Sequence, residues 1–151
     1  MADFETALKS GQKFEDIVLK QINKKYPNAK RIEGYFKGGD IYVPDINKYI
    51  EVKADLKSEY TGNTVVEIEF NGKPSALSTT ESWYWVFCDE LFTAWIFPDM
   101  IWKCIIENKL KPAVFIGKGD VVSKKAYLIP RRLLYSYSDK LIQYTNPKFS
   151  K

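Results

Sequence analysis

The chain has 151 residues, of which 45% are hydrophobic and 15% aromatic, so it can form one domain with its own core, spanning residues 1–151. Histidine is absent, which excludes Ser-His-Asp triads, histidine-metal nuclease motifs and two-histidine ribonuclease mechanisms. The formal net charge is +4, and residues 102–151 carry 11 basic but only 3 acidic side chains. A basic last third favours contact with a phosphate backbone, although it also serves solubility alone.

The sequence shows no pattern typical of a transmembrane segment, a signal peptide or a zinc knuckle. No apolar run reaches transmembrane length, and residues 1–16 carry charges throughout, without the apolar stretch of a signal peptide. The two cysteines, Cys88 and Cys104, are too far apart for a zinc knuckle and are expected to be buried thiols. We therefore expect a cytoplasmic protein with no membrane partner.

The first predicted element is a helix over residues 12–25, which ends before Tyr26-Pro27. Its apolar stripe has helical spacing and consists of Phe14, Ile17, Val18 and Ile22. Glu15 lies beside that stripe. It either points toward a neighbouring sheet or serves as a first-turn acid that the helix dipole favours. A strand over residues 30–36 is predicted next.

Residues 38–55 predict a β-hairpin. The β-rich runs 41–43 and 49–52 flank a cluster of turn formers. Glu51 and Lys53 are two residues apart, so both side chains leave the same face of their strand. Asp40 opens the first strand and is expected opposite that face, whereas Asp45 is expected at the hairpin tip. Gly38-Gly39 allows a close backbone approach just before Asp40.

The strand register decides which partner Asp40 meets. Pairing Val43 or Pro44 with Tyr49 would put Asp40 near Lys53 and Tyr42 near Glu51. The three charged groups would then converge, and two carboxylates that close repel each other. A divalent cation removes this repulsion and activates water against a phosphodiester. Oxygen ligands favour Mg²⁺, with Mn²⁺ as a substitute, over zinc.

The middle of the chain predicts a polar loop over 55–63 and a strand over 65–70, followed by an Asn71-Gly72 turn. Lys57 in the loop is expected near the exit of the site. Glu67 and Glu69 share one strand face and are either an additional metal ligand or solvated side chains. The spacing of Ser78 and Glu81 fits a capping box that opens a short helix. The hydroxyls of Ser78, Thr79 and Thr80 are alternatively phosphate contacts.

The last part of the chain predicts aromatic strands over 83–88 and 92–97, whose alternating pattern favours core packing over base stacking. A helix from Pro98, late strands over 113–116 and 126–129 and a helix from Pro130 follow. Arg131 and Arg132 lie in the first turn of that helix, where cations oppose the dipole. We therefore expect them, together with Lys124 and Lys125, to contact the DNA backbone.

The hairpin resembles the catalytic core of the PD-(D/E)XK nuclease superfamily, which includes restriction enzymes, Holliday-junction resolvases and phage nucleases. The resemblance covers the first third of the chain. It implies that Asp40 and Glu51 hold the metal, that Lys53 is the catalytic lysine and that Glu15 is the helical acid. Pro does not precede Asp40, which departs from the family pattern. The expected fold is a mixed central sheet flanked by helices, similar to a restriction endonuclease.

The expected activity is that of a magnesium-dependent DNA endonuclease, of the junction-resolving or the sequence-specific restriction or homing type. By the same resemblance, small members act as homodimers or higher oligomers. The alternative is a non-catalytic nucleic-acid-binding protein that keeps the fold. A binding module has no need for an intact set of Asp and Glu-x-Lys, so the sequence favours the enzyme. A hairpin with a solvated surface ion pair remains the structural alternative.

Overall fold

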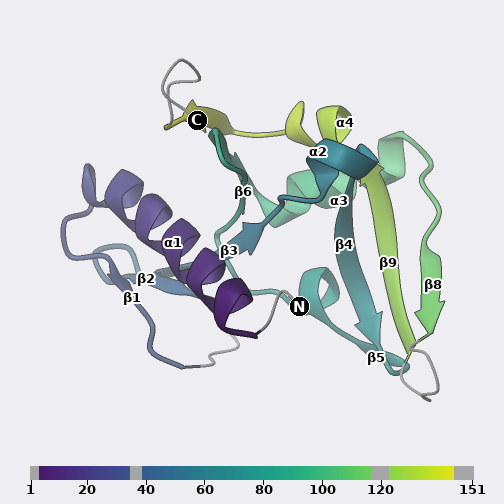
Figure 1. Cartoon of the computed structure of the whole chain (residues 1–151), viewed down its shortest axis with the longest axis horizontal. Coiled ribbons are helices and arrows are strands. Elements are labelled where there is room, and N and C mark those ends of the chain that lie inside the picture. Colours follow the sequence, from purple (N-terminus) through teal and green to yellow (C-terminus); the bar gives the residue numbers. More distant parts are fainter. Residues whose placement is uncertain (1–3, 35–38, 117–122, 145–151) are drawn as a thin grey trace.

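The computed structural model describes residues 4–34, 39–116 and 123–144, and it is built from two sheets (Figure 1). The six-stranded sheet has the order β1-β2-β3-β6-β7-β10, and the four-stranded sheet has the order β5-β4-β9-β8. β3 and β6 are parallel, while the other neighbours in both sheets are antiparallel. The prediction of an α/β fold with a mixed sheet is therefore confirmed.

The strands of the larger sheet are β1 (Lys30–Arg31), β2 (Ile41–Val43), β3 (Lys48–Ala54), β6 (Tyr84–Cys88), β7 (Phe92–Ile96) and β10 (Lys140–Gln143). Those of the smaller sheet are β4 (Asn63–Phe70), β5 (Lys73–Pro74), β8 (Ala113–Ile116) and β9 (Ser123–Pro130). The helices are α1 (Phe4–Asn23), α2 (Ser58–Thr61), α3 (Pro98–Glu107), α4 (Arg131–Tyr135) and the 3-10 turn η1 (Ala76–Ser78).

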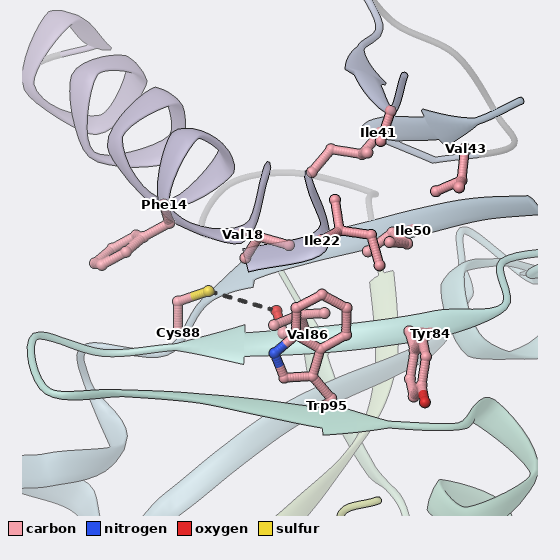
Figure 2. Packing of buried hydrophobic residues seen from close by; sticks show 11 residues of the cluster. Phe14, Val18, Ile22, Ile41, Val43, Ile50, Tyr84, Val86, Cys88 and Trp95 are labelled. Atoms are coloured by element: carbon pink, nitrogen blue, oxygen red, sulfur yellow. Dashed lines mark hydrogen bonds between the residues drawn. The ribbon is translucent and has the colours of Figure 1, made fainter. Parts of the chain in front are cut away.

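One face of the larger sheet is covered by α1 (Figure 2). The predicted stripe residues Phe14, Val18 and Ile22 are buried there, because their spacing places them on a single helix face. They pack against inward-facing strand residues, namely Ile41, Val43, Ile50, Tyr84, Val86, Cys88 and Trp95. This packing fixes the hairpin of β2 and β3 under the helix.

The opposite face of β6 forms a second core with the four-stranded sheet and α3. Trp85 and Phe87 point to this side, where they join Val66 of β4 and Ile101 of α3. Every residue of β6 is buried, because helix α1 covers one face and the second core covers the other. The expectation that the aromatic strands serve the core is confirmed.

Several predicted elements differ in extent from the structure. α1 begins at Phe4 rather than residue 12, and β1 spans only Lys30–Arg31, with residues 35–38 outside the described part. The predicted 55–63 loop contains α2. The prediction that Ser78 caps a helix is wrong, since Ser78 instead ends η1. In the predicted turn at 117–125, residues 117–122 lie outside the described part.

Some elements are as predicted, and one was not anticipated. The Asn71-Gly72 turn joins β4 to β5, and both of its residues have positive φ, as a tight hairpin turn requires. β10 was not predicted; it pairs with β7 at the sheet edge. No helix in the described part of the chain is both long and apolar enough to span a membrane.

Candidate active site

The register of the β2–β3 hairpin differs from the predicted one. Tyr42 pairs with Tyr49 and Ile41 with Ile50, so Asp40 continues the ladder toward Glu51 rather than Lys53. Of the two predicted pairings, that of Val43 with Tyr49 would have set Ile41 opposite Glu51 and so mixed apolar and charged side chains on a single face. The observed pairing sets Ile41 directly opposite Ile50, and both side chains enter the core under α1.

Asp40 is held at the start of β2 by the backbone of β3. The Asp40 amide donates to the Ile50 carbonyl at 2.8 Å, and the Val52 amide donates to Asp40 Oδ2, also at 2.8 Å. Gly39 permits this approach, because a Cβ at that position would lie 2.8 Å from the Ile50 carbonyl oxygen. The Asp40 carboxylate is therefore fixed against the strand that carries Glu51.

Asp45 lies in the turn between β2 and β3, as predicted. There its Oδ1 accepts a hydrogen bond from Asn28 Nδ2 at 3.3 Å. It is not among the residues that line the hollow beside Asp40. The choice of Asp40 over Asp45 as the site residue agrees with this geometry.

Asp40, Glu51 and Lys53 line one hollow of about 530 Å³. Lys53 Nζ lies 3.1 Å from Glu51 Oε2 and 4.9 Å from the centroid of the Trp85 ring, so the ammonium is held between a carboxylate and an aromatic face. The rest of the lining comes from both sheets and the segment between them: Gly34, Glu67, Phe70, Ser75, Ala76, Thr79, Thr80 and Trp85.

Burial and neighbouring carboxylates raise the pKa values of two acidic groups at the site, Asp40 and Glu15. Burial, together with the nearby Glu51 carboxylate, raises the pKa of Asp40 to about 6, against the opposing effects of the Val52 amide and Lys53. Burial and the charge of Asp40 likewise raise the pKa of Glu15. These carboxyl groups therefore favour a compensating cation.

Glu15 reaches the neighbourhood of the site from α1. The fields of both Asp40 and Glu51 act on it, and Arg31 Nε lies 3.3 Å from Glu15 Oε1. Glu15 does not line the hollow itself. Its ion pair with Arg31 of β1 agrees with the expectation that it points toward the sheet. The alternative of a first-turn acid is wrong, because α1 begins at Phe4 and Glu15 lies in its middle.

The hollow offers two carboxylates as ligands for a hard cation. Asp40 and Glu51 supply carboxylate oxygens, which Mg²⁺ prefers. Within residues 4–34, 39–116 and 123–144, no three acidic or cysteine side chains are grouped closely enough to ligate one ion. Two carboxylates, with water and substrate oxygens completing the shell, are a usual arrangement for Mg²⁺, so the residues fit this ion.

The three hydroxyl residues predicted as phosphate contacts, Ser78, Thr79 and Thr80, differ in where their side chains lie. Thr79 and Thr80 line the hollow, and Thr80 Oγ1 accepts from Trp85 Nε1 at 3.0 Å. Ser78 Oγ donates to the Ile68 carbonyl at 2.7 Å and does not line the hollow. Of the three, Thr79 and Thr80 line the hollow and Ser78 does not.

Glu67 faces the hollow, whereas Glu69 is not among its lining residues. A β-bulge in β4 lies between the two, which breaks the shared face that the alternating sequence predicted. Ser75 Oγ donates to Glu67 Oε2 at 2.7 Å, so this carboxylate is fixed at the rim. Trp85 and Phe70 were not predicted as site residues, because their apolar pattern reads as core.

The basic residues of the last third divide into two groups. Lys124 lies 3.5 Å from Glu67 at the hollow, and Lys125 lies 3.5 Å from Glu69. Both side chains are substantially exposed, and neither lines the hollow. Lys57 is exposed at the start of α2 and does not line the hollow.

Arg131 has a partner within the fold. Its guanidinium forms an ion pair with the Asp89 carboxylate, whose side chain is 1% exposed, and lies 5.3 Å from the Tyr135 ring centroid. The unfavourable position of the Arg131 cation in the first turn of α4 is therefore offset within the fold by the Asp89 carboxylate. Arg132 lines a separate shallow depression with Phe92 and Leu141.

A second buried carboxylate lies next to Asp89. The Asp55 amide donates to the Cys88 carbonyl, and Asp55 Oδ2 accepts from Ser58, Thr64 and Tyr135 hydroxyls at 2.9, 2.9 and 2.5 Å. These bonds tie α2, β4 and α4 to the end of β3. No sequence pattern predicted this network, in which Tyr135 lies 80 residues from Asp55 along the chain.

Comparison with known proteins gives no match: no family model, no curated protein and no solved structure resembles the chain significantly.

Proposed function

We propose that this protein is a magnesium-dependent DNA endonuclease of the PD-(D/E)XK type, with a restriction endonuclease-like fold. The observation that supports this most strongly is the convergence of Asp40, Glu51 and Lys53 on one hollow. These residues come from two adjacent strands of a mixed sheet whose other face is covered by α1. The expected dimer belongs to the same proposal and is tested by the mass of the protein in solution.

The residues of the hollow have distinct roles in this proposal. Asp40 and Glu51 would hold Mg²⁺, which supplies a Lewis acid and an activated water when bound. The Lys53 ammonium stabilises the negative charge that develops on the pentacovalent phosphate. Its contacts with Glu51 and Trp85 position it before the substrate arrives, so little reorganisation is needed.

The direct test is incubation of the protein with supercoiled, linear and four-way-junction DNA, with and without Mg²⁺. Nicking or linearisation that depends on Mg²⁺ supports the enzyme, and a preference for the junction selects the resolvase type. DNA binding without any cleavage, with either Mg²⁺ or Mn²⁺, would refute the enzyme and favour a non-catalytic binding protein.

A matched pair of variants tests the site assignment. Asp40→Asn should abolish cleavage, because it removes a ligand charge from the hollow, while DNA binding persists or tightens through reduced repulsion of phosphate. Asp45→Asn is the control and should cleave nearly normally, since Asp45 lies in the hairpin turn. An inactive Asp45→Asn together with an active Asp40→Asn would show that the site lies elsewhere.

A further inference from the structure

A row of three side chains crosses the edge of the larger sheet next to the candidate site. Lys30 pairs with Tyr42 across β1 and β2, and Tyr42 pairs with Tyr49 across β2 and β3. Residues directly opposite in antiparallel strands project from the same face. Lys30, Tyr42 and Tyr49 therefore share one face of the sheet.

That face is also the one that carries the candidate catalytic residues. Tyr49 and Glu51 are two apart on β3, and Tyr42 and Asp40 are two apart at the start of β2, so each pair leaves its strand on the same side. Two residues along a strand span about 6.6 Å. The tyrosine row thus lies one side-chain row away from the carboxylates.

The tyrosine row borders a groove of about 480 Å³ between β1 and the two rings. This groove is lined by Lys30, Arg31, Ile32, Glu33, Tyr42 and Tyr49. Glu33 precedes Gly34, which lines the catalytic hollow. The two depressions therefore follow one another along the same edge of the sheet.

The rings of the row are held in place but are not part of either core. Their centroids are 4.7 Å apart with a tilt of 32°, and the Tyr42 hydroxyl donates to Asn47 Oδ1 at 2.9 Å. Neither ring belongs to the two buried clusters, which take Ile41 and Ile50 from the opposite face. A cross-strand aromatic pair alone would stabilise the hairpin, but it would not require a groove with a cationic edge.

The two basic residues of β1 lie on opposite faces of the sheet. Arg31 pairs with Asp16 at 2.9 Å and with Glu15 of α1, and so is committed to the helix side. Lys30 is exposed in the row itself. An aromatic surface with an adjacent exposed ammonium is the combination that binds a base and its phosphate in single-stranded nucleic acids.

We propose that this groove binds an unpaired nucleotide of the DNA substrate next to the scissile phosphate, with its base against Tyr42 and Tyr49 and its phosphate on Lys30. The inference rests on the proposed nuclease function and narrows its substrate class. The preferred DNA would carry a single-stranded segment beside the cleavage point, as in a flap, an overhang or an opened junction.

The test measures binding in EDTA, where no metal-dependent hydrolysis takes place. Probes are a single-stranded oligonucleotide, a duplex with a single-stranded overhang and a blunt duplex, each containing fluorescent 2-aminopurine. The first two should bind more tightly than the blunt duplex, with quenching of an unpaired 2-aminopurine by the rings. Tyr49→Leu should weaken single-strand binding about tenfold and abolish the quenching, while Tyr49→Phe restores both.

The salt dependence separates stacking from charge. Tyr49→Leu should leave the slope of log affinity against log salt unchanged, whereas Lys30→Gln should flatten it by about 0.7 for a single strand. Tyr60→Leu is the control, since Tyr60 is 87% exposed and lies outside the row. Thermal unfolding of each variant shows whether the fold is retained.

Two results would overturn the inference: equal affinity for single-stranded and blunt duplex DNA, or unchanged binding and quenching in a folded Tyr49→Leu. Neither depends on cleavage. If plasmid DNA is cleaved while Tyr49→Leu binds normally, the stacking groove is refuted and the nuclease proposal stands. If stacking is observed without cleavage under any metal condition, the groove is supported and the nuclease proposal fails.

Discussion

Gly39→Ala tests whether a close backbone contact sets the position of Asp40. Gly39 has φ +147°, and an added Cβ would lie 2.8 Å from the Ile50 carbonyl oxygen and 3.2 Å from Tyr49 Cβ. Both obstacles belong to β3, which is pinned between β2 and β6, so neither can move freely. The substitution therefore strains the backbone and overpacks the hairpin at once.

Each of these effects costs about 1 to 3 kcal/mol, and together we expect a loss of about 2 to 5 kcal/mol in the free energy of unfolding. For a chain of this length, that lowers the melting temperature by roughly 5 to 15 °C. The Ile50 carbonyl also accepts the Asp40 amide bond, so cleavage by the folded fraction should fall as well. Calorimetry and plasmid nicking at a temperature below the transition measure the two effects separately.

Two other glycines provide matched controls. Gly11 lies within α1 with open space around its Cβ position, so Gly11→Ala should stabilise the protein by about 0.5 to 1 kcal/mol. Gly72 has φ +83° but also open space, so Gly72→Ala should cost about 1 to 2 kcal/mol from backbone strain alone. A Gly39→Ala protein as stable as the wild type, or less affected than Gly72→Ala, would refute the reasoning.

Four further variants separate catalysis from folding. Lys53→Met should reduce turnover strongly with little change in melting temperature, because its ammonium is more than a third exposed; full activity would remove Lys53 from the mechanism. Glu15→Gln should give a smaller loss of cleavage, and no loss would assign Glu15 to its ion pair alone. Arg131→Ala should destabilise the fold by about 3 to 5 kcal/mol, because Asp89 is left buried without its cation, while Arg132→Ala should leave unfolding nearly unchanged. Equal melting temperatures for the two arginine variants would contradict a structural role for the Asp89 pair.

The register of the β2–β3 hairpin shows how much of the structure the sequence patterns predict. The alternation of Glu51 and Lys53, and the turn formers before Lys48, were enough to predict two strands and to place Asp45 in the turn. They did not decide which residue of β3 lies opposite Asp40, because turns of several lengths are compatible with the same sequence. In the structure, Tyr42 pairs with Tyr49, and Ile41 lies directly opposite Ile50 in the core under α1.

The chain by itself determined the local elements: the amphipathic stripe of α1, the aromatic strands β6 and β7 and the Asn71-Gly72 turn all follow from short-range spacing. Only the tertiary structure decided which distant charges meet. Arg131 was predicted to contact DNA because its helix position is locally unfavourable, but the Asp89 carboxylate, distant in sequence, compensates for it. Glu67 turns into the hollow at a bulge that strand alternation does not reveal. Spacing encodes which face a side chain takes, whereas its electrostatic partners depend on how the two sheets pack, and that information is spread over the whole chain.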